Sequence, residues 1–399
     1  MKIVTSVNEP YLGLLDVWRR QSSRHVPGST TVVCMDEGAF ARCALLDGVD
    51  AVRASSGPAT AARHDFWLRR FDALATAHEA DDLLHTDADA FWLRPVSPLL
   101  GGLPDDMIFS REYGIPRTVA AKWGFVLCCG FFLARSTPAT RAFFARWRDA
   151  TRRRMDDQLA LNELLVEMGA TWASVDVEGR QAERCVIRVG GASFSILALP
   201  HSTVSREPPY GAPDAFVAHP YFERQFFRSY VDLMDGLLDE TGSVTGAGSF
   251  PIAASPEGIK PRDFATGEAL RWLLERRPDN PAHWAHLGQL SLRMSRPVEA
   301  GKALDAAQSL RPHDSATLFN LGMGLAALGR HREAVGHLRG LVGRADLEFD
   351  LARKASARLA RLGAWPAATE LAIHAARTVS MAGGMTLAAR LLRRAVARG

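Results

Sequence analysis

The chain has 399 residues, of which 47% are hydrophobic and 23% charged, and its formal net charge is +4. This length predicts two or three domains, and the composition excludes a disordered or fibrous chain. No apolar run approaches the ~20 residues that span a bilayer, and the residues after Met1 indicate a strand rather than a secretory leader. The five cysteines form no C-x-x-C pair, so we expect reduced thiols in the cytoplasm and no zinc or redox site.

The charge is divided unevenly along the chain. From Pro256 onward the chain has 22 Lys and Arg and 13 Asp and Glu, so the formal net charge of this part is +9. The residues before it have a formal net charge of −5. A basic rear part suits an acidic partner, a membrane surface or nucleic acid, but we favour a solvated Arg-rich helix surface. Aromatic residues are not interleaved with the basic ones, so we expect no nucleic-acid partner. The expected location is the cytoplasm, either free or peripheral at the membrane.

Strand-like and helix-like runs alternate over roughly the first 235 residues. Apolar and β-branched runs predict the strands, and helical spacing predicts the helices between them. We expect strands at 2–7, 30–35, 82–85, 124–134, 194–199 and 215–218, and helices at 9–21, 60–78, 138–152 and 156–168. This order predicts an α/β domain with a mostly parallel, Rossmann-like sheet and helices on both of its faces.

The composition changes between residues 239 and 261. The run 242–249 is Gly, Ser, Thr and Ala apart from Val244, and prolines follow, which indicates a linker. Behind it a 34-residue period appears, because the L-G at 287–288 recurs at 321–322 and the A-x3-L at 300–304 recurs at 334–338. This is the tetratricopeptide pattern, in which small residues let paired helices approach closely. We therefore predict three parts: an α/β domain at 1–238, a linker at 239–261 and all-α repeats at 262–399.

Two carboxylates follow the strand predicted at 82–85. Residues 82–94 read DLLHTDADAFWLR, so Asp87 and Asp89 are two residues apart and, in an extended chain, point the same way. Open α/β sheets bind ligands at the carboxyl ends of their strands. Carboxylates there suit Mg²⁺ or Mn²⁺, which can bridge a diphosphate and neutralise a leaving group. A D-x-D alone is often a solvated turn, but the strand before it and Phe91-Trp92 after it favour a site.

Other polar residues are weaker candidates. Arg63, Arg69 and Arg70 lie on the helix before the D-x-D strand and can make bidentate contacts to phosphate, although for each one alone we favour a solvated helix residue. Asp36 closes the second predicted strand and can contact a ribose.

These motifs together resemble those of another group of proteins. The chain resembles the nucleotide-diphospho-sugar transferases of GT-A fold, in particular the retaining branch related to glycogenin and bacterial galactosyltransferases, and the plant arabinosyl- and xylosyltransferases. Besides the D-x-D, residues 127–132 (LCCGFF) look like the family's N-x-G-F-F strand, with Cys128 where Asn or Ser is usual. Residues 156–158 (DDQ) with Asn162 look like its D-Q-x-x-x-N signature. The resemblance covers roughly residues 1–235.

The resemblance implies roles for these residues. It places the base and ribose of the nucleotide beside Thr5, Ser6, Val7, Asn8 and Tyr11, and the rest of the donor beside Asp87, Ala88, Asp89 and Gly130. It brings Asp157 to the sugar or acceptor and Gln158 to the anomeric carbon. It also implies a third metal ligand near His219, in FVAHP at 216–220, although the fuller family motif is missing. A structural histidine that caps the following helix remains an equal alternative.

The activity implied is that of a metal-dependent hexosyl- or pentosyltransferase. It would move a sugar from a UDP-linked donor to a carbohydrate or protein acceptor, as in polysaccharide biosynthesis, and retain the anomeric configuration by front-face attack without a general base. The repeats would bind an acceptor, a partner protein or a second copy.

Three other functions were weighed against this one. The alternative from another class is a tetratricopeptide interaction scaffold with an inactive GT-A domain, which Cys128 and the incomplete His219 motif keep open. A haloacid-dehalogenase-type phosphatase would carry its D-x-D near the N-terminus. A nucleotidyltransferase would need a Gly-rich loop at 8–11, where the sequence reads NEPY.

Overall fold

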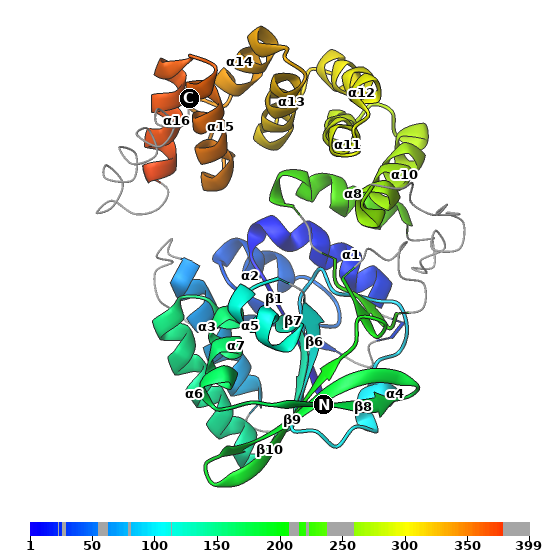
Figure 1. The fold of residues 1–399 in the computed structure, drawn as a ribbon, viewed down its shortest axis with the longest axis vertical. Coiled ribbons are helices and arrows are strands. Elements are labelled where there is room, and N and C mark those ends of the chain that lie inside the picture. The colour runs from blue at the N-terminus through cyan, green and yellow to red at the C-terminus, as the bar shows by residue number, and fades with distance from the viewer. Residues whose placement is uncertain are drawn as a thin grey trace. The chain divides into compact units, whose positions relative to one another are not determined.

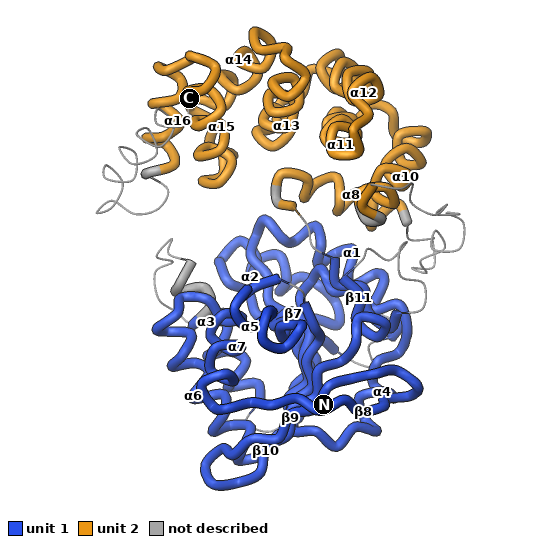
Figure 2. Tube along the Cα trace, viewed as in Figure 1, with its two compact units in different colours: residues 1–221, 238–249 blue, residues 222–237, 250–399 orange. Residues whose placement is uncertain are grey.

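The chain divides into two compact units. The computed structural model describes residues 1–22, 24–25, 29–54, 63–78, 81–112, 114–206, 215–220, 223–237 and 259–377. Unit 1 comprises residues 1–221 and 238–249, and unit 2 comprises residues 222–237 and 250–399 (Figure 2). Residues 222–237, which we had included in the first predicted domain, thus fall in unit 2. The predicted linker lies almost wholly outside the described residues, and our domain limits stay predictions.

Unit 1 is built on a nine-stranded mixed sheet. Its strand order is β3 (Val49–Arg53), β2 (Thr30–Cys34), β1 (Lys2–Val7), β4 (Leu83–Thr86), β7 (Val126–Ala134), β6 (Met107–Glu112), β10 (Ala192–Leu199), β9 (Arg180–Val189) and β8 (Trp172–Val177) (Figure 1). Strands β3, β2, β1 and β4 are parallel, as are β6 and β10, but β7 is antiparallel to both its neighbours and β8, β9 and β10 form a meander. The sheet is therefore mixed, and the prediction of a mostly parallel sheet holds only in part.

The difference from the predicted strand directions has a local cause. Strands β8, β9 and β10 are joined by tight turns with positive φ at Glu178, Gly179, Gly190 and Gly191 rather than by crossover helices. Such turns join antiparallel neighbours, whereas parallel strands need a crossover of a dozen or more residues. We predicted no strands at 172–189, and we therefore did not predict the hairpin that β8 and β9 form.

Helices cover the sheet and enclose an aromatic core. Unit 1 contains η1 (Glu9–Tyr11), α1 (Leu12–Ser22), α2 (Glu37–Cys43), α3 (Arg63–His78), α4 (Ser97–Gly101), α5 (Arg117–Trp123), α6 (Pro138–Arg154) and α7 (Asp157–Glu167). Phe71 of α3 and Phe143 and Trp147 of α6 pack against Phe109 and Phe132 of the sheet in one cluster of buried side chains. Burial of this apolar surface is the main stabilising term for the scaffold that carries the site.

A second, three-stranded sheet lies in the order β11 (Val204–Ser205), β12 (Val217–Ala218) and β5 (Phe91–Trp92). Strand β12 is parallel to β11 and antiparallel to β5. It therefore brings residues near 205, 218 and 91 together, although they are far apart in the sequence.

Unit 2 is helical in its described part. It contains η3 (Arg224–Phe226), α8 (Phe227–Leu237), α10 (Pro261–Arg276), α11 (Pro281–Arg293), α12 (Pro297–Ser309), α13 (Ser315–Ala327), α14 (His331–Arg339), α15 (Phe349–Arg361) and α16 (Trp365–Arg377). The helices begin at 281, 315 and 349 and at 297, 331 and 365, so each set repeats every 34 residues, the period seen in the sequence. The tetratricopeptide assignment itself stays a prediction.

The repeated glycines mark the closest approach of paired helices. A Cβ at Gly288 would lie 2.7 Å from Leu304 Cγ, and a Cβ at Gly322 would lie 2.5 Å from Leu338 Cγ. Both contacts join residues at equivalent positions of α11 with α12 and of α13 with α14. The period therefore reflects a packing requirement. No helix in the described ranges is long and apolar enough to cross a bilayer.

Candidate metal and nucleotide-sugar site

The candidate site lies where three parallel strands end. Strand β1 pairs with β4 through Val4 and His85, and with β2 through Val7 and Cys34. Because the strands are parallel, the residues that follow them, including Asn8, Asp36 and Asp87, emerge at one edge of the sheet. This is the edge at which ligands bind in open α/β sheets.

A tight turn carries the D-x-D motif. The Ala90 N–H donates to the Asp87 carbonyl at 3.0 Å, and the Asp87 N–H donates to the Gly130 carbonyl at 2.7 Å. The indole N–H of Trp18 donates to the Ala90 carbonyl at 2.9 Å and fixes the end of this turn. Asp89 is therefore not in extended chain, and the reason we gave for the shared direction of the two carboxylates is wrong. The turn, rather than the pleat, brings them together.

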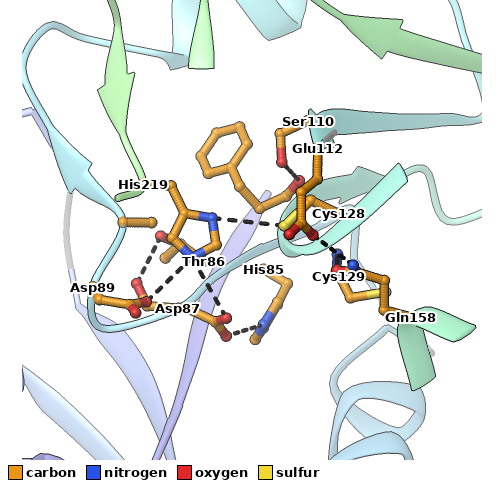
Figure 3. A network of polar contacts seen from close by, with 12 residues as sticks. His85, Thr86, Asp87, Asp89, Ser110, Glu112, Cys128, Cys129, Gln158 and His219 are labelled. Carbon is orange, nitrogen blue, oxygen red and sulfur yellow. Dashed lines mark hydrogen bonds and ion pairs between the residues drawn. The ribbon is translucent and has the colours of Figure 1, made fainter. Parts of the chain in front are cut away.

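The short sheet brings His219 to this turn. Ala218 pairs with Phe91, and the His219 N–H donates to the Ser205 carbonyl at 2.8 Å, so His219 emerges beside the D-x-D (Figure 3). Its Nε2 lies 3.3 Å from Asp89 Oδ1 and 3.9 Å from Asp87 Oδ2. Candidate ligand atoms of Asp87, Asp89 and His219 all lie within 4.8 Å of one another. Of the two roles left open for His219, this geometry favours the metal ligand.

Gly130 lets the side chains of His219 and Asp87 lie directly against strand β7. A Cβ at this position would lie 2.1 Å from His219 Cε1 and 2.6 Å from Asp87 Oδ2. Strand β7 thus presents bare backbone to these side chains. Two carboxylates and an imidazole whose ligand atoms lie within 4.8 Å of one another fit a divalent cation such as Mn²⁺ or Mg²⁺.

A buried arginine contacts the first carboxylate of the D-x-D motif. Arg70 of α3 contacts Asp87 Oδ1 through Nη1 at 3.3 Å and Asp157 Oδ2 through Nη2 at 2.6 Å, and its Nη2 also donates to the Cys129 carbonyl at 3.4 Å. The side chains of Arg70 and Asp157 are only 6% and 5% exposed. The residue of α3 that binds both carboxylates is Arg70, whereas the side chain of Arg63 lies outside the described residues and Arg69 is half-buried one position earlier.

The same contacts set the charge of the two carboxyl groups. Burial opposes ionisation of Asp87, but Arg70 and a 3.1 Å contact from His85 Nε2 outweigh it and lower the pKa of Asp87. Burial lowers the pKa of His85, so its ring is neutral and donates through Nε2–H. For Asp157 burial prevails over Arg70 and raises its pKa. Asp87 is thus held ionised, as a metal ligand must be.

Helix α7 places the D-Q pair beside strand β7. Asn162 accepts from the Leu127 N–H at 2.8 Å and donates to the Leu127 carbonyl at 2.9 Å, which fastens the helix to the strand. Gln158 donates through Nε2 to Glu112 Oε2 at 2.5 Å and accepts through Oε1 from the Cys129 N–H at 3.4 Å (Figure 3). Its Nε2 also donates to the Ile115 carbonyl at 3.1 Å, so three neighbours orient the Gln158 carboxamide.

Cys128 stands where the family pattern has Asn or Ser. Its side chain faces the candidate metal cluster of Asp87, Asp89 and His219. Its Sγ lies 3.7 Å from His219 Nδ1 and 3.6 Å from Arg206 Nη1, and Arg206 Nη1 lies 2.7 Å from the same Nδ1. Burial would raise the pKa of the Cys128 thiol, but the charge of Arg206 beside it lowers the pKa.

Protonation of His219 and its contact with Arg206 exclude each other. A doubly protonated ring has no lone pair, so Arg206 cannot donate to Nδ1 at 2.7 Å when His219 is charged. The contact therefore belongs to the neutral ring, with its proton on Nε2 toward Asp89.

Residues predicted for the base and ribose line the end of β1. The hydroxyls of Thr5 and Ser6 are buried and have no hydrogen-bond partner in the described part of the chain. Val7 ends the strand, Asn8 precedes η1, and Tyr11 ends η1. Asp36 caps α2, since its carboxylate accepts from the Ala39 N–H at 2.8 Å and from the Glu9 N–H at 3.0 Å. These contacts account for Asp36 without a ligand, and its contact with ribose stays a prediction.

Two charged residues of the site escaped the sequence analysis. Glu112 ends strand β6, which we did not predict, and Arg206 follows the two-residue strand β11. Neither belongs to a recognisable motif. An apolar, strand-like run within residues 107–112 was the one sequence signal that could have indicated strand β6 and therefore Glu112 at its end.

Comparison with known proteins bears on this unit. Residues 28–216, a little under half of the chain, match the family model described as nucleotide-diphospho-sugar transferase. This match supports a nucleotide-sugar glycosyltransferase in unit 1. No curated protein matches the chain.

Solved structures of glycosyltransferases are also similar. A galactosyltransferase, LgtC, in complex with donor and acceptor sugar analogues, is 14% identical with a TM-score of 0.39, over 64% of this chain and 98% of that one. The apo form of the glycosyltransferase GlyE of Streptococcus pneumoniae TIGR4 is 15% identical with a TM-score of 0.31, over 42% of this chain and 44% of that one.

Proposed function

We propose that unit 1 transfers a sugar from a nucleoside diphosphate sugar, UDP-linked, to a carbohydrate or protein acceptor with retention of configuration. The proposal holds that Asp87, Asp89 and His219 bind Mn²⁺ or Mg²⁺. The observation that carries it is the convergence of these three side chains, whose ligand atoms lie within 4.8 Å of one another beside Gly130. The family match of residues 28–216 supports the nucleotide-sugar donor.

The proposed roles follow from the contacts. A bound divalent ion would neutralise charge on the departing diphosphate. Arg70 keeps Asp87 ionised and fixes Asp157 beside it, so Asp157 acts at the sugar side of the same cluster. Gln158, oriented by Glu112 and the Cys129 N–H, would lie near the anomeric carbon.

The donor's nucleoside end would lie on β1. The unpartnered hydroxyls of Thr5 and Ser6 are at its carboxyl end, and Asn8 and Tyr11 follow. Buried hydroxyls without partners cost free energy, so a ligand that supplies acceptors or donors there would recover it.

Unit 2 is proposed to be a tetratricopeptide array that binds the acceptor, a protein partner or a second copy of the chain. The repeat of helix starts every 34 residues supports this. Stacked helical hairpins form extended surfaces suited to peptides or chains. The rival proposal, an interaction scaffold with an inactive unit 1, rests on Cys128 in place of Asn and on the incomplete motif around His219.

A donor screen tests the proposed function. UDP- and GDP-sugars are added with and without Mn²⁺ to the full chain, and the melting temperature and the release of nucleoside diphosphate are measured. We expect stabilisation and slow release of UDP from one UDP-sugar with Mn²⁺ present. The control Asp149→Asn changes an exposed carboxylate of α6 and should behave as wild type, whereas Asp87→Asn should not respond. If no nucleotide sugar stabilises the wild type, the scaffold proposal is favoured.

A further inference from the structure

The guanidinium of Arg206 occupies an unusual position at the candidate metal cluster. Strands β11 and β12 are parallel and pair Ser205 with Ala218, so the residues that follow them, Arg206 and His219, emerge side by side. Arg206 Nη1 donates to His219 Nδ1 at 2.7 Å and approaches Cys128 Sγ at 3.6 Å. A full positive charge is thus fixed next to a predicted metal ligand.

This charge has no carboxylate partner. Arg70, Arg135 and Arg184 in the same unit each contact a carboxylate at 2.6 to 2.8 Å. Within the described residues, no carboxylate oxygen lies within 4.0 Å of the Arg206 guanidinium, although Asp87, Asp89 and Glu112 act on it through space. A guanidinium offers five N–H donors in a fork that matches carboxylate or phosphate, and an imidazole nitrogen and a thiol use only part of it.

The contact of Arg206 with His219 is incompatible with a metal on His219 Nε2. A neutral imidazole that ligates a metal through Nε2 carries its proton on Nδ1. Nδ1–H and the Arg206 N–H would then be two donors facing each other at 2.7 Å, so this hydrogen bond must break. Cys128 Sγ, 3.7 Å from Nδ1, is in place to accept the Nδ1–H instead. Arg206 would be released when the ion and its bound nucleotide arrive.

We propose that Arg206 binds the diphosphate of the donor and stabilises its charge as it departs. This rests on the proposed function of unit 1 and adds a residue that no motif indicates. Arg70 does not suit the role, because its side chain is buried and engaged by Asp157 and Asp87. Arg206 is next to the same cluster, and phosphate oxygens are the bidentate acceptors that it lacks there.

The test compares UDP binding by calorimetry at saturating Mn²⁺ in the full chain. Arg206→Gln removes the charge, Arg206→Lys keeps a point charge without the fork, and Arg188→Gln makes the same charge change on strand β9, where Arg188 donates to the Gly191 carbonyl. Charged hydrogen bonds predict an affinity loss of about 10- to 100-fold for Arg206→Gln. Arg206→Lys should lose less, and Arg188→Gln should bind as wild type. Melting temperatures check that each variant is folded.

The outcomes separate this proposal from the one on which it rests. Wild-type UDP affinity in Arg206→Gln would overturn the role of Arg206 and leave the proposed function intact. An unchanged affinity at saturating Mn²⁺ with a higher Mn²⁺ requirement would make Arg206 a support for His219 and also overturn it. If the wild type binds neither UDP nor GDP with Mn²⁺, both proposals fall. If Arg206→Gln and Arg188→Gln lose affinity equally, the effect is one of net charge and the proposal is refuted.

Discussion

Replacing Gly130 with alanine should close the candidate metal site without unfolding the protein. The added Cβ would lie 2.1 Å from His219 Cε1 and 2.6 Å from Asp87 Oδ2. Carbon atoms approach to about 3.5 Å at the closest favourable contact, so the ring must move by about 1.4 Å. Metal sites tolerate deviations of only about 0.2 Å in ligand distance, so His219 would no longer serve as a ligand.

The two consequences differ in size. The clash involves the outer end of a side chain, and the φ of Gly130 lies outside the positive range, so the variant keeps its strand. Overpacking and the stiffer unfolded chain oppose each other, and the unfolding free energy should change by less than about 2 kcal/mol. Loss of a ligand should weaken Mn²⁺-dependent UDP binding by at least the ~10- to 100-fold typical of changes around metal ligands.

The assay is calorimetric titration of UDP with Mn²⁺, together with a urea melt. Gly101→Ala in α4 is the matched control, because a Cβ there meets no atom within 4 Å. The control should bind UDP as wild type does. If Gly130→Ala binds UDP with wild-type affinity in the presence of Mn²⁺, the reasoning is refuted, because the positions of Asp87 and His219 would then not matter for nucleotide binding.

Three further predictions concern stability. Arg70→Gln leaves the buried carboxyl of Asp157 without its partner, so chemical denaturation should show a loss of about 3–5 kcal/mol, and a loss below 1 kcal/mol would contradict the buried pair. Burial opposes the ionisation of Asp346, but Ser315 and Arg344 outweigh it and lower its pKa to about 2. The contribution of ionised Asp346 to the free energy of unfolding is therefore complete above about pH 4 and is lost as the pH falls toward 2. The loss of unfolding free energy caused by Asp346→Asn should shrink over that range, and a pH-independent loss would contradict this prediction. Gly322→Leu should cost about 1–3 kcal/mol in a thermal melt, whereas Gly336→Ala, whose Cβ meets nothing within 4 Å, should not destabilise.

Local patterns in the sequence predicted most of the elements around the site. Strand β1 and helices α3, α6 and α7 lie within a few residues of their expected limits, because each is rich in apolar residues and α6 and α7 also have a capping residue, at Thr137 and Asp156. The helix starts of unit 2 follow the same 34-residue period as the repeated glycines. These features depend on residues close together in the chain.

The sheet's mixed direction and part of the site depend on distant contacts. Strand β7 pairs antiparallel with β4 and β6, and nothing within its own apolar run specifies the direction of a partner. Arg206 reaches the cluster only because two-residue strands pair across the fold, and such strands are too short to show a period. The D-x-D was found by its motif, but the turn that brings Asp89 to Asp87 was not.

The central claim is that Asp87, Asp89 and His219 hold a divalent ion together with a nucleoside diphosphate. Titration of UDP into the full chain, with and without Mn²⁺, tests it most directly when wild type and Asp89→Asn are compared. Asp89→Asn removes a half-buried charge and no apolar volume, so its melting temperature should equal or slightly exceed that of wild type. We predict UDP binding by wild type only with Mn²⁺, and no metal-dependent binding by the variant. Equal metal-dependent affinity in the two proteins would contradict the account.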